Sequence, residues 1–150
     1  RCDDTASNLL RSTDSFFICS LFDDGADLAN RGVDVSHRGG LPGFIRVDDD
    51  RTLTFPDYAG NRFFNTLGNI LLNPLTGLLV IDYTSGSLLY LTGSTEILWD
   101  TPERERFSGA ERLLRFRLEE ALLVSHVLPL RWEFIEYSPQ LVNSVRNNQT

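Results

Sequence analysis

Short apolar or alternating segments, separated by turn-forming residues, recur along this chain of 150 residues and constrain its fold most strongly. Strands are predicted over 16–22, 32–36, 44–47, 53–55, 77–83 and 88–99. Clusters such as DDDR at 48–51 and SGS at 85–87 favour hairpin turns between them. Residues 128–137 also alternate, which predicts a final strand. At least six short strands with hairpin connections are typical of a mainly β, antiparallel barrel.

Helical signals are few. Apolar residues recur at helical spacing from Phe63 to Leu71 and end before Pro74, which predicts one helix. Residues 3–14 suit a short helix or a surface lead-in. Thr101 before Pro102 resembles the start of a short helical turn. Residues 110–122 fit either a helical stripe or a strand, and periodicity alone leaves both open.

The basic residues exclude several enzyme classes, because all 14 are Arg and Lys is absent. A Walker phosphate loop, a pyridoxal phosphate enzyme and a class I aldolase each need a Lys. The net charge of -7 also argues against nucleic-acid binding, which requires clustered positive charge. Any anion bound here must be held by a few local Arg side chains.

Cysteine and histidine are equally sparse. Cys2 and Cys19 are predicted to be free thiols, and two His residues provide neither a metal site nor a zinc-protease motif.

No apolar run approaches the length of a membrane span, and no secretory signal is recognisable, so a cytoplasmic protein without membrane contact is expected. The length predicts a single domain over 1–150, and the absence of Met at position 1 suggests a trimmed N-terminus.

Two segments are candidates for binding. The first is SHRGGLPGF at 36–44, interpreted as an irregular loop or a bulged strand that carries His37 and Arg38. The second is GNR at 60–62, which would deliver Arg62 to the first turn of a helix, where unpaired amides favour an anion. The alternatives are that Asn61 caps the helix, that Arg62 is a solvated surface charge, and that His37 is structural.

These two segments in this order resemble the pyridoxamine 5'-phosphate oxidase-like family of FMN-binding split barrels. The similarity spans 34–83 and continues through 89–100 and 128–139, carried by HRGG-x-PGF followed by D-x-x-GNR-x-x-x-T-x-x-N. The resemblance implies a homodimer of six-stranded split barrels with FMN at the dimer interface. It also favours a strand over 113–120.

The resemblance further implies a set of FMN-binding residues. Arg38, Gly39 and Gly40 would border the flavin, with Ser36 or His37 near its ring or ribityl chain. Phe55, Pro56 and Asp57 would present backbone to the isoalloxazine edge. Asn61 and Arg62 would hold the phosphate, with Thr66 and Asn69 completing the cradle.

The expected function is that of an FMN-dependent oxidoreductase acting on an unknown small substrate or electron acceptor. Pyridoxamine phosphate oxidase activity itself is not expected, because Phe63 follows Arg62 where that enzyme has Lys, and its C-terminal substrate segment is absent. No residue stands out as a catalytic acid or base, and no metal is expected. The alternatives are a non-catalytic flavin-binding or redox-sensing module, and a split barrel that uses F420 or haem.

Overall fold

The computed structural model describes residues 1–23, 32–59 and 65–137. Its strands are β1 Ser15–Phe22, β2 Gly32–Gly39, β3 Arg46–Val47, β4 Thr52–Tyr58, β5 Leu75–Asp82, β6 Ser87–Leu98 and β7 Ala110–Val124. The helices are α1 Asp4–Ser12, α2 Asn65–Leu72 and the short 3-10 helix η1 Pro102–Arg106. The six strand segments predicted between residues 16 and 99 are present. The start of the predicted helix, at Phe63 and Phe64, lies outside the described residues.

The described strands form one antiparallel sheet in the order β2-β1-β5-β6-β7-β4-β3. The sheet therefore has seven strands where six were expected. The seventh is β7, from the segment whose periodicity was ambiguous. It pairs with β6 on one side and β4 on the other, so its alternation of Leu114, Phe116 and Leu118 with Arg115 and Arg117 decides its conformation.

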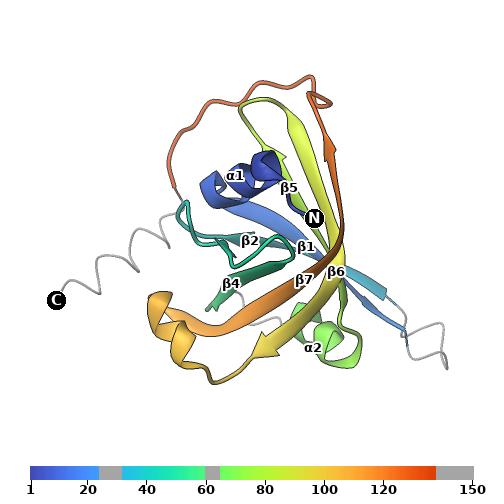
Figure 1. Cartoon of the computed structure of the whole chain (residues 1–150), viewed down its shortest axis with the longest axis vertical. Coiled ribbons are helices and arrows are strands. Elements are labelled where there is room, and N and C mark those ends of the chain that lie inside the picture. The colour runs from blue at the N-terminus through green and yellow to red at the C-terminus, as the bar shows by residue number, and fades with distance from the viewer. Residues whose placement is uncertain (24–31, 60–64, 138–150) are drawn as a thin grey trace.

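The sheet coils around an apolar core, and this brings β4 back toward β1 and β2 (Figure 1). Phe16 of β1 is nearly inaccessible and contacts the ring of Phe55 of β4 edge to face, with 4.9 Å between centroids. It also stacks on Phe44 at 5.8 Å. The three rings join strands that are not neighbours in the sheet, which holds the coiled shape.

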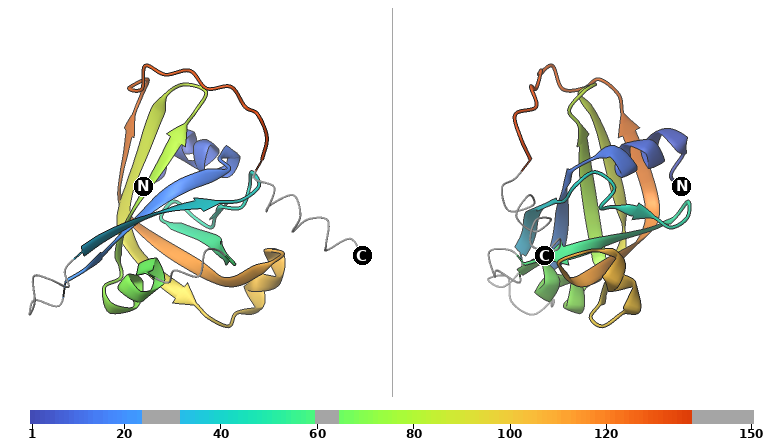
Figure 2. Two further views of the ribbon diagram at one scale, coloured as in Figure 1. Left: turned by 180° about the vertical axis from the view of Figure 1, so that it is seen from behind. Right: turned by 90° about the vertical axis from the view of Figure 1, so that its left-hand side faces the viewer.

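Helix α1 begins where the Asp3 carboxylate accepts a hydrogen bond from the Ala6 amide, at 2.8 Å. It buries Ala6 and Leu10 against the core, and Figure 2 shows it lying across the coiled sheet. This confirms the helical alternative for residues 3–14. No helix in the described ranges is long and apolar enough to cross a membrane.

Residues 36–44 combine the two alternatives. Residues 36–39 continue β2 in regular register with Ser15 to Ile18, without a bulge, and the irregular loop begins only after Gly39. The predicted final strand is wrong, because residues 128–137 form no strand. Their side chains alternate in type, but their backbone makes no hydrogen bond to another described strand, which a sheet requires.

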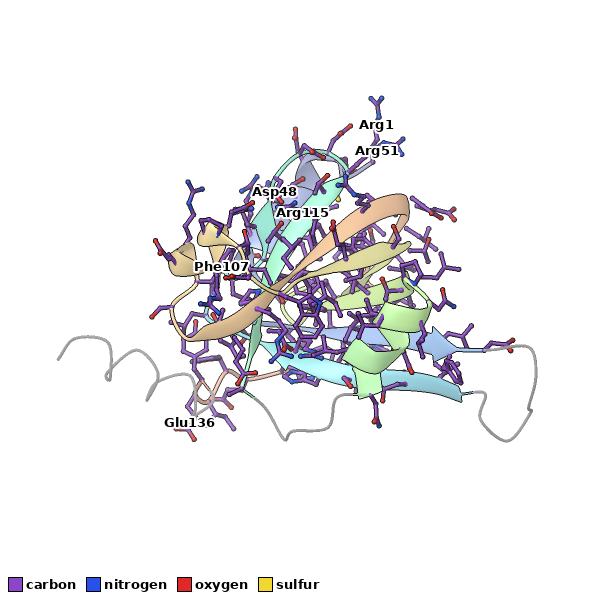
Figure 3. The ribbon with its side chains drawn as sticks, turned by 90° about the horizontal axis from the view of Figure 1, so that it is seen from below. Arg1, Asp48, Arg51, Phe107, Arg115 and Glu136 are labelled. Atoms are coloured by element: carbon purple, nitrogen blue, oxygen red, sulfur yellow. The ribbon has the colours of Figure 1, made fainter. Side chains whose placement is uncertain are left out.

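A register shift in the sheet and one confirmed prediction concern β6 and η1. Glu119 of β7 is an extra residue between the partners of Thr92 and Gly93, so β7 bulges opposite them. A Cβ at Gly93 would lie 2.1 Å from the Arg117 carbonyl oxygen, so only glycine fits there. Thr101 caps η1 before Pro102. The carboxylate of Glu103 in η1 accepts hydrogen bonds from Arg46 and, at 2.9 Å, from Arg115, and Figure 3 shows Arg115 and Phe107 near this end of the sheet.

Candidate functional site

A buried ion cluster joins β2 to β4. The guanidinium of Arg38 donates to Oδ1 of Asp57, and Nε of Arg112 on β7 lies 3.5 Å from Oδ2 of the same carboxylate. Asp57 is only 4% exposed, and both Arg side chains are mostly buried. Strands β2 and β4 lie near opposite ends of the sheet order, so this cluster ties the two ends together.

One donor in this cluster has no partner. Nε of Arg38 is buried and makes no hydrogen bond within the described chain. Leaving a charged donor unpaired away from water costs free energy, so such a group is a candidate contact for a ligand acceptor. Arg38 is therefore positioned by Asp57, and its buried Nε–H remains available to a ligand.

The edge of β4 beside this cluster is open. Strand β3 pairs with β4 only at Leu53 and Thr54, so Phe55, Pro56 and Asp57 have no described strand partner on the side away from β7. The side chains of Phe55 and Pro56 are buried, which leaves backbone at this edge. This arrangement suits the predicted role of residues 55–57, which present main chain to a flat ligand.

Gly39 and Gly40 have specific packing reasons to lack a side chain. A Cβ on Gly40 would lie 2.4 Å from the Phe44 ring, and one on Gly39 would lie 3.3 Å from His37. The Gly40 amide donates to the carbonyl oxygen of Asp14 at 2.9 Å. The Gly40 amide is therefore already hydrogen-bonded within the protein. The absence of a side chain on Gly40 makes room for the Phe44 ring.

A second polar cluster joins β2 to α2. The hydroxyls of Ser36 and Thr66 lie 2.9 Å apart, and both donate to Oδ2 of Asp34, at 3.0 and 2.6 Å respectively. One turn further along α2, the Asn69 amide donates to Ser20 of β1 at 3.1 Å. These contacts bring Ser36, Thr66 and Asn69 together on one side of α2.

His37 points to the opposite face of β2. It is exposed and contacts the Phe17 ring edge to face, with 5.5 Å between ring centroids. The structure therefore separates it from Ser36 and Arg38, which face inward. Side chains alternate across a strand, so residues 36 and 38 share one face and residue 37 takes the other.

The predicted residues Asn61 and Arg62 lie outside the described residues. Sequence reasoning missed Asp34 and Arg112. Asp34 could have been found from its spacing of two from Ser36 on a strand, whereas Arg112 was hidden by the ambiguous period of its segment.

Burial raises the pKa of the Tyr58 phenol, next to Asp57 in the sequence. In the described part of the chain, no three His, Cys, Asp or Glu side chains cluster as metal ligands, and Cys2 and Cys19 are both free.

The coiled antiparallel sheet with helices α1 and α2 matches the fold of several solved structures, among them a protein described as a putative pyridoxamine 5'-phosphate oxidase. HupZ from Group A Streptococcus matches with a TM-score of 0.61 at 11% identity, over 83% of this chain and 94% of that one. A putative pyridoxamine 5'-phosphate oxidase from Lactobacillus delbrueckii gives 0.59 at 14%, over 81% and 93%. An FMN-binding protein from Syntrophomonas wolfei gives 0.54 at 14%, over 83% and 90%.

Neither a protein-family model nor a curated protein sequence matches the chain. At these identities the structural neighbours establish the fold, and the ligand and reaction must be argued from the residues.

Proposed function

We propose that this chain is a flavoprotein that binds FMN beside Arg38 and the open edge of β4. The observation that carries the proposal is the buried Nε–H of Arg38, which has no partner in the described chain. The hydrogen bond to Asp57 holds the guanidinium in place, so this donor is preorganised. One structural neighbour is itself described as FMN-binding, which supports a flavin in this fold.

The residues present fit a flavin. Arg38 offers a charged donor to a ring carbonyl or phosphate oxygen, and residues 55–57 offer backbone to a ring edge. The hydroxyls of Ser36 and Thr66 lie together at α2, on the inner side of β2 that Arg38 also faces. A bound flavin supplies hydride or electron transfer, and the protein contributes binding, orientation and electrostatic tuning.

The reaction we propose is oxidation or reduction of a small substrate or electron acceptor. No described side chain is assigned as a catalytic acid or base, because the carboxylates at the site are engaged by Arg38, Arg112, Ser36 and Thr66. The chemistry therefore rests on the cofactor. A cytoplasmic location, expected from the sequence, stays a prediction.

We further propose that two copies associate through the outer face of the sheet. Val33 and Val35 of β2 are 64% and 62% exposed, and they pair in register with Leu21 and Cys19 of β1. The same face continues through Leu79 to Tyr90 and Leu122, which are also paired in register. The exposed large apolar side chains of this face are Leu21, Val33, Val35, Tyr90 and Leu122. Contiguous exposed apolar surface of this kind marks an interaction site.

Titration of FMN fluorescence with the purified protein tests the cofactor assignment. We expect saturable quenching, and we expect Arg38→Lys, which keeps the charge but removes Nε–H, to weaken affinity on the order of tenfold. Arg115→Lys is the matched control, because Arg115 pairs with Glu103 instead of Asp57. Equal affinity of the two variants would remove Arg38 from the site. Binding of F420 or haem without FMN would overturn the flavin assignment.

A further inference from the structure

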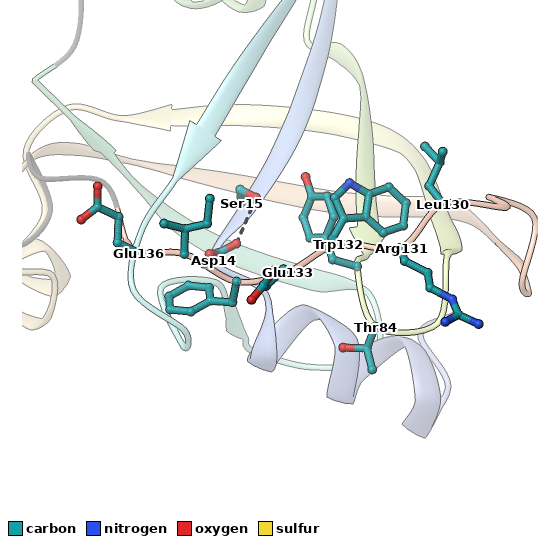
Figure 4. A pocket seen from close by; sticks show the side chains of 11 residues that line it. Asp14, Ser15, Thr84, Leu130, Arg131, Trp132, Glu133 and Glu136 are labelled. Carbon is teal, nitrogen blue, oxygen red and sulfur yellow. Dashed lines mark hydrogen bonds between the residues drawn. The ribbon is translucent and has the colours of Figure 1, made fainter.

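A cavity of about 730 Å³ lies beneath the segment that follows β7. This segment, residues 128–137, is called the strap here. The strap passes the start of β1 and the turn after β5 (Figure 4). A volume of this size is typical of sites for small organic molecules.

Two contacts attach the strap to the turn between β5 and β6. The Leu128 amide donates to the Gly86 carbonyl oxygen at 3.0 Å, and the Trp132 ring meets Tyr83 edge to face, with 5.3 Å between centroids. Among the described residues, 129–137 make no backbone hydrogen bond to the rest of the chain. The strap is therefore held off the sheet by side chains, which leaves the space beneath it.

The cavity has aromatic walls. Tyr83 lies in the turn directly after β5, and Trp132 and Phe134 come from the strap. Ring faces carry negative electrostatic potential, so a cation placed against them is attracted, most strongly by Trp. The exposed parts of these rings also give a flat molecule apolar surface to contact.

The cavity is also acidic. Asp14, Glu133 and Glu136 line it, against a single cationic residue, Arg131. None of the three carboxylates forms an ion pair within the described chain, and only Asp14 accepts a side-chain hydrogen bond, from Ser15 at 3.1 Å. In Figure 4 the Arg131 guanidinium lies at the opposite end of the strap from Glu136. The negative charge of the cavity is therefore not neutralised internally.

We propose that this cavity binds an organic cation with a flat aromatic ring. The aromatic walls and the unpaired carboxylates favour the same charge. The volume exceeds what an inorganic ion or a simple ammonium group needs. An aromatic anion of the same shape would meet three like charges and should be rejected.

The cavity borders the candidate flavin site without depending on it. Asp14, which lines the cavity, accepts the Gly40 amide through its backbone, and Ser15 pairs with Gly39 in the sheet. The inference rests on the cavity alone, so it is tested on protein without added flavin. Failure of flavin binding would leave it standing, and its own failure would leave the flavin proposal standing.

Isothermal titration with three probes of one shape tests the proposal. We expect the 1-methylnicotinamide cation to bind about tenfold more tightly than neutral nicotinamide, and anionic nicotinate to bind most weakly. Weaker binding of the cation than of the neutral probe, or equal binding of all three, would overturn it.

Variants locate the binding. Glu133→Gln should reduce the affinity for the cation several-fold and bring it closer to that of nicotinamide. Glu120→Gln, the same change on the exposed outer part of β7, should leave it unchanged. Trp132→Phe should retain most of the affinity and Trp132→Ala should lose it, with circular dichroism to check the fold. An equal effect of Glu120→Gln and Glu133→Gln would place the cation elsewhere on the surface and contradict the site.

Discussion

Arg38 and Asp57 form an ion pair between two strands that lie near opposite ends of the sheet order. The pair does two things at once. It holds β2 against β4 where the coiled sheet would otherwise part, and it fixes the guanidinium whose Nε–H is free for a ligand. Stability and the proposed binding are therefore coupled at this point of the fold.

Asp57→Asn should destabilise the protein by about 3 kcal/mol, because it takes the carboxylate partner from the buried Arg38 and removes one of the two carboxylates that Arg112 contacts. Urea unfolding followed by circular dichroism measures this. Asp50→Asn, at an exposed ion pair with Arg1, should cost less than about 1 kcal/mol. Similar losses for both variants would mean that the central pair contributes no more than a surface one.

Asp34→Asn should tighten FMN binding relative to riboflavin. The Asp34 carboxylate accepts from both Ser36 and Thr66, and an anion there opposes a phosphate at the same hydroxyls. We expect the affinity for FMN to rise on the order of fivefold while that for riboflavin stays the same. Parallel fluorescence titrations give the ratio. An unchanged ratio would place the phosphate away from this cluster.

Acid should destabilise the protein partly through Glu103. The hydrogen bond from Arg46 lowers the pKa of this carboxyl, against a smaller opposing effect of burial, and Arg115 lowers it further. A carboxyl with a lowered folded pKa adds stability above its unfolded value, and that stability is lost as pH falls through the folded value. The free energy of unfolding should therefore fall between about pH 5 and pH 3.

Glu103→Gln should flatten that decline, because Gln does not titrate. Glu120→Gln serves as the control at an exposed position on β7. Chemical unfolding at a series of pH values measures the slope for each variant. A slope in Glu103→Gln as steep as in the original protein would show that the Arg46 and Arg115 contacts do not couple to acid unfolding.

Gly93→Ala and Gly68→Ala should have opposite effects. A Cβ at Gly93 would overlap the Arg117 carbonyl oxygen, so we expect a loss of about 2 kcal/mol or more. A Cβ at Gly68, inside α2, meets nothing within 4 Å, and Ala there should stabilise by about 1 kcal/mol. Thermal and urea unfolding test both signs. A neutral Gly93→Ala would contradict the tight bulge.

Val35→Asp should shift the protein from dimer to monomer, because it puts a charge in the middle of the outer apolar face. Leu72→Asp is the matched control, since Leu72 is 70% exposed but lies on α2, away from that face. Sedimentation velocity over a range of concentrations measures the association. A monomeric original protein, or dissociation by both variants alike, would reject the proposed interface.

The strand pattern was predictable because alternation and turn residues act locally. Segments such as Phe16 to Phe22 and Leu88 to Trp99 appear nearly as expected. The conformation of β7 could not be decided locally, because its Leu and Ala residues satisfy both periods, and pairing with β4 and β6 settles it. The prediction of a strand over the strap was wrong for the same reason. An alternating pattern does not show whether a neighbouring strand is there to pair with it.

The sequence indicated some residues of the two polar clusters, but it did not indicate their contacts. Arg38, Asp57, Ser36 and Thr66 were all named from the sequence, but nothing in their spacing indicated that they bond to one another or to Asp34 and Arg112. Such contacts depend on how the sheet coils. The packing of Gly40 against Phe44 is likewise a tertiary fact, although the glycine itself was visible.

The visible absorption spectrum of the purified protein tests the central claim most directly. The protein is mixed with excess FMN, passed through a gel-filtration column, and measured at its elution peak. We predict a two-banded flavin spectrum that elutes with the protein at the size of a dimer. A colourless protein peak, with all FMN in the small-molecule fraction, would contradict the flavin assignment.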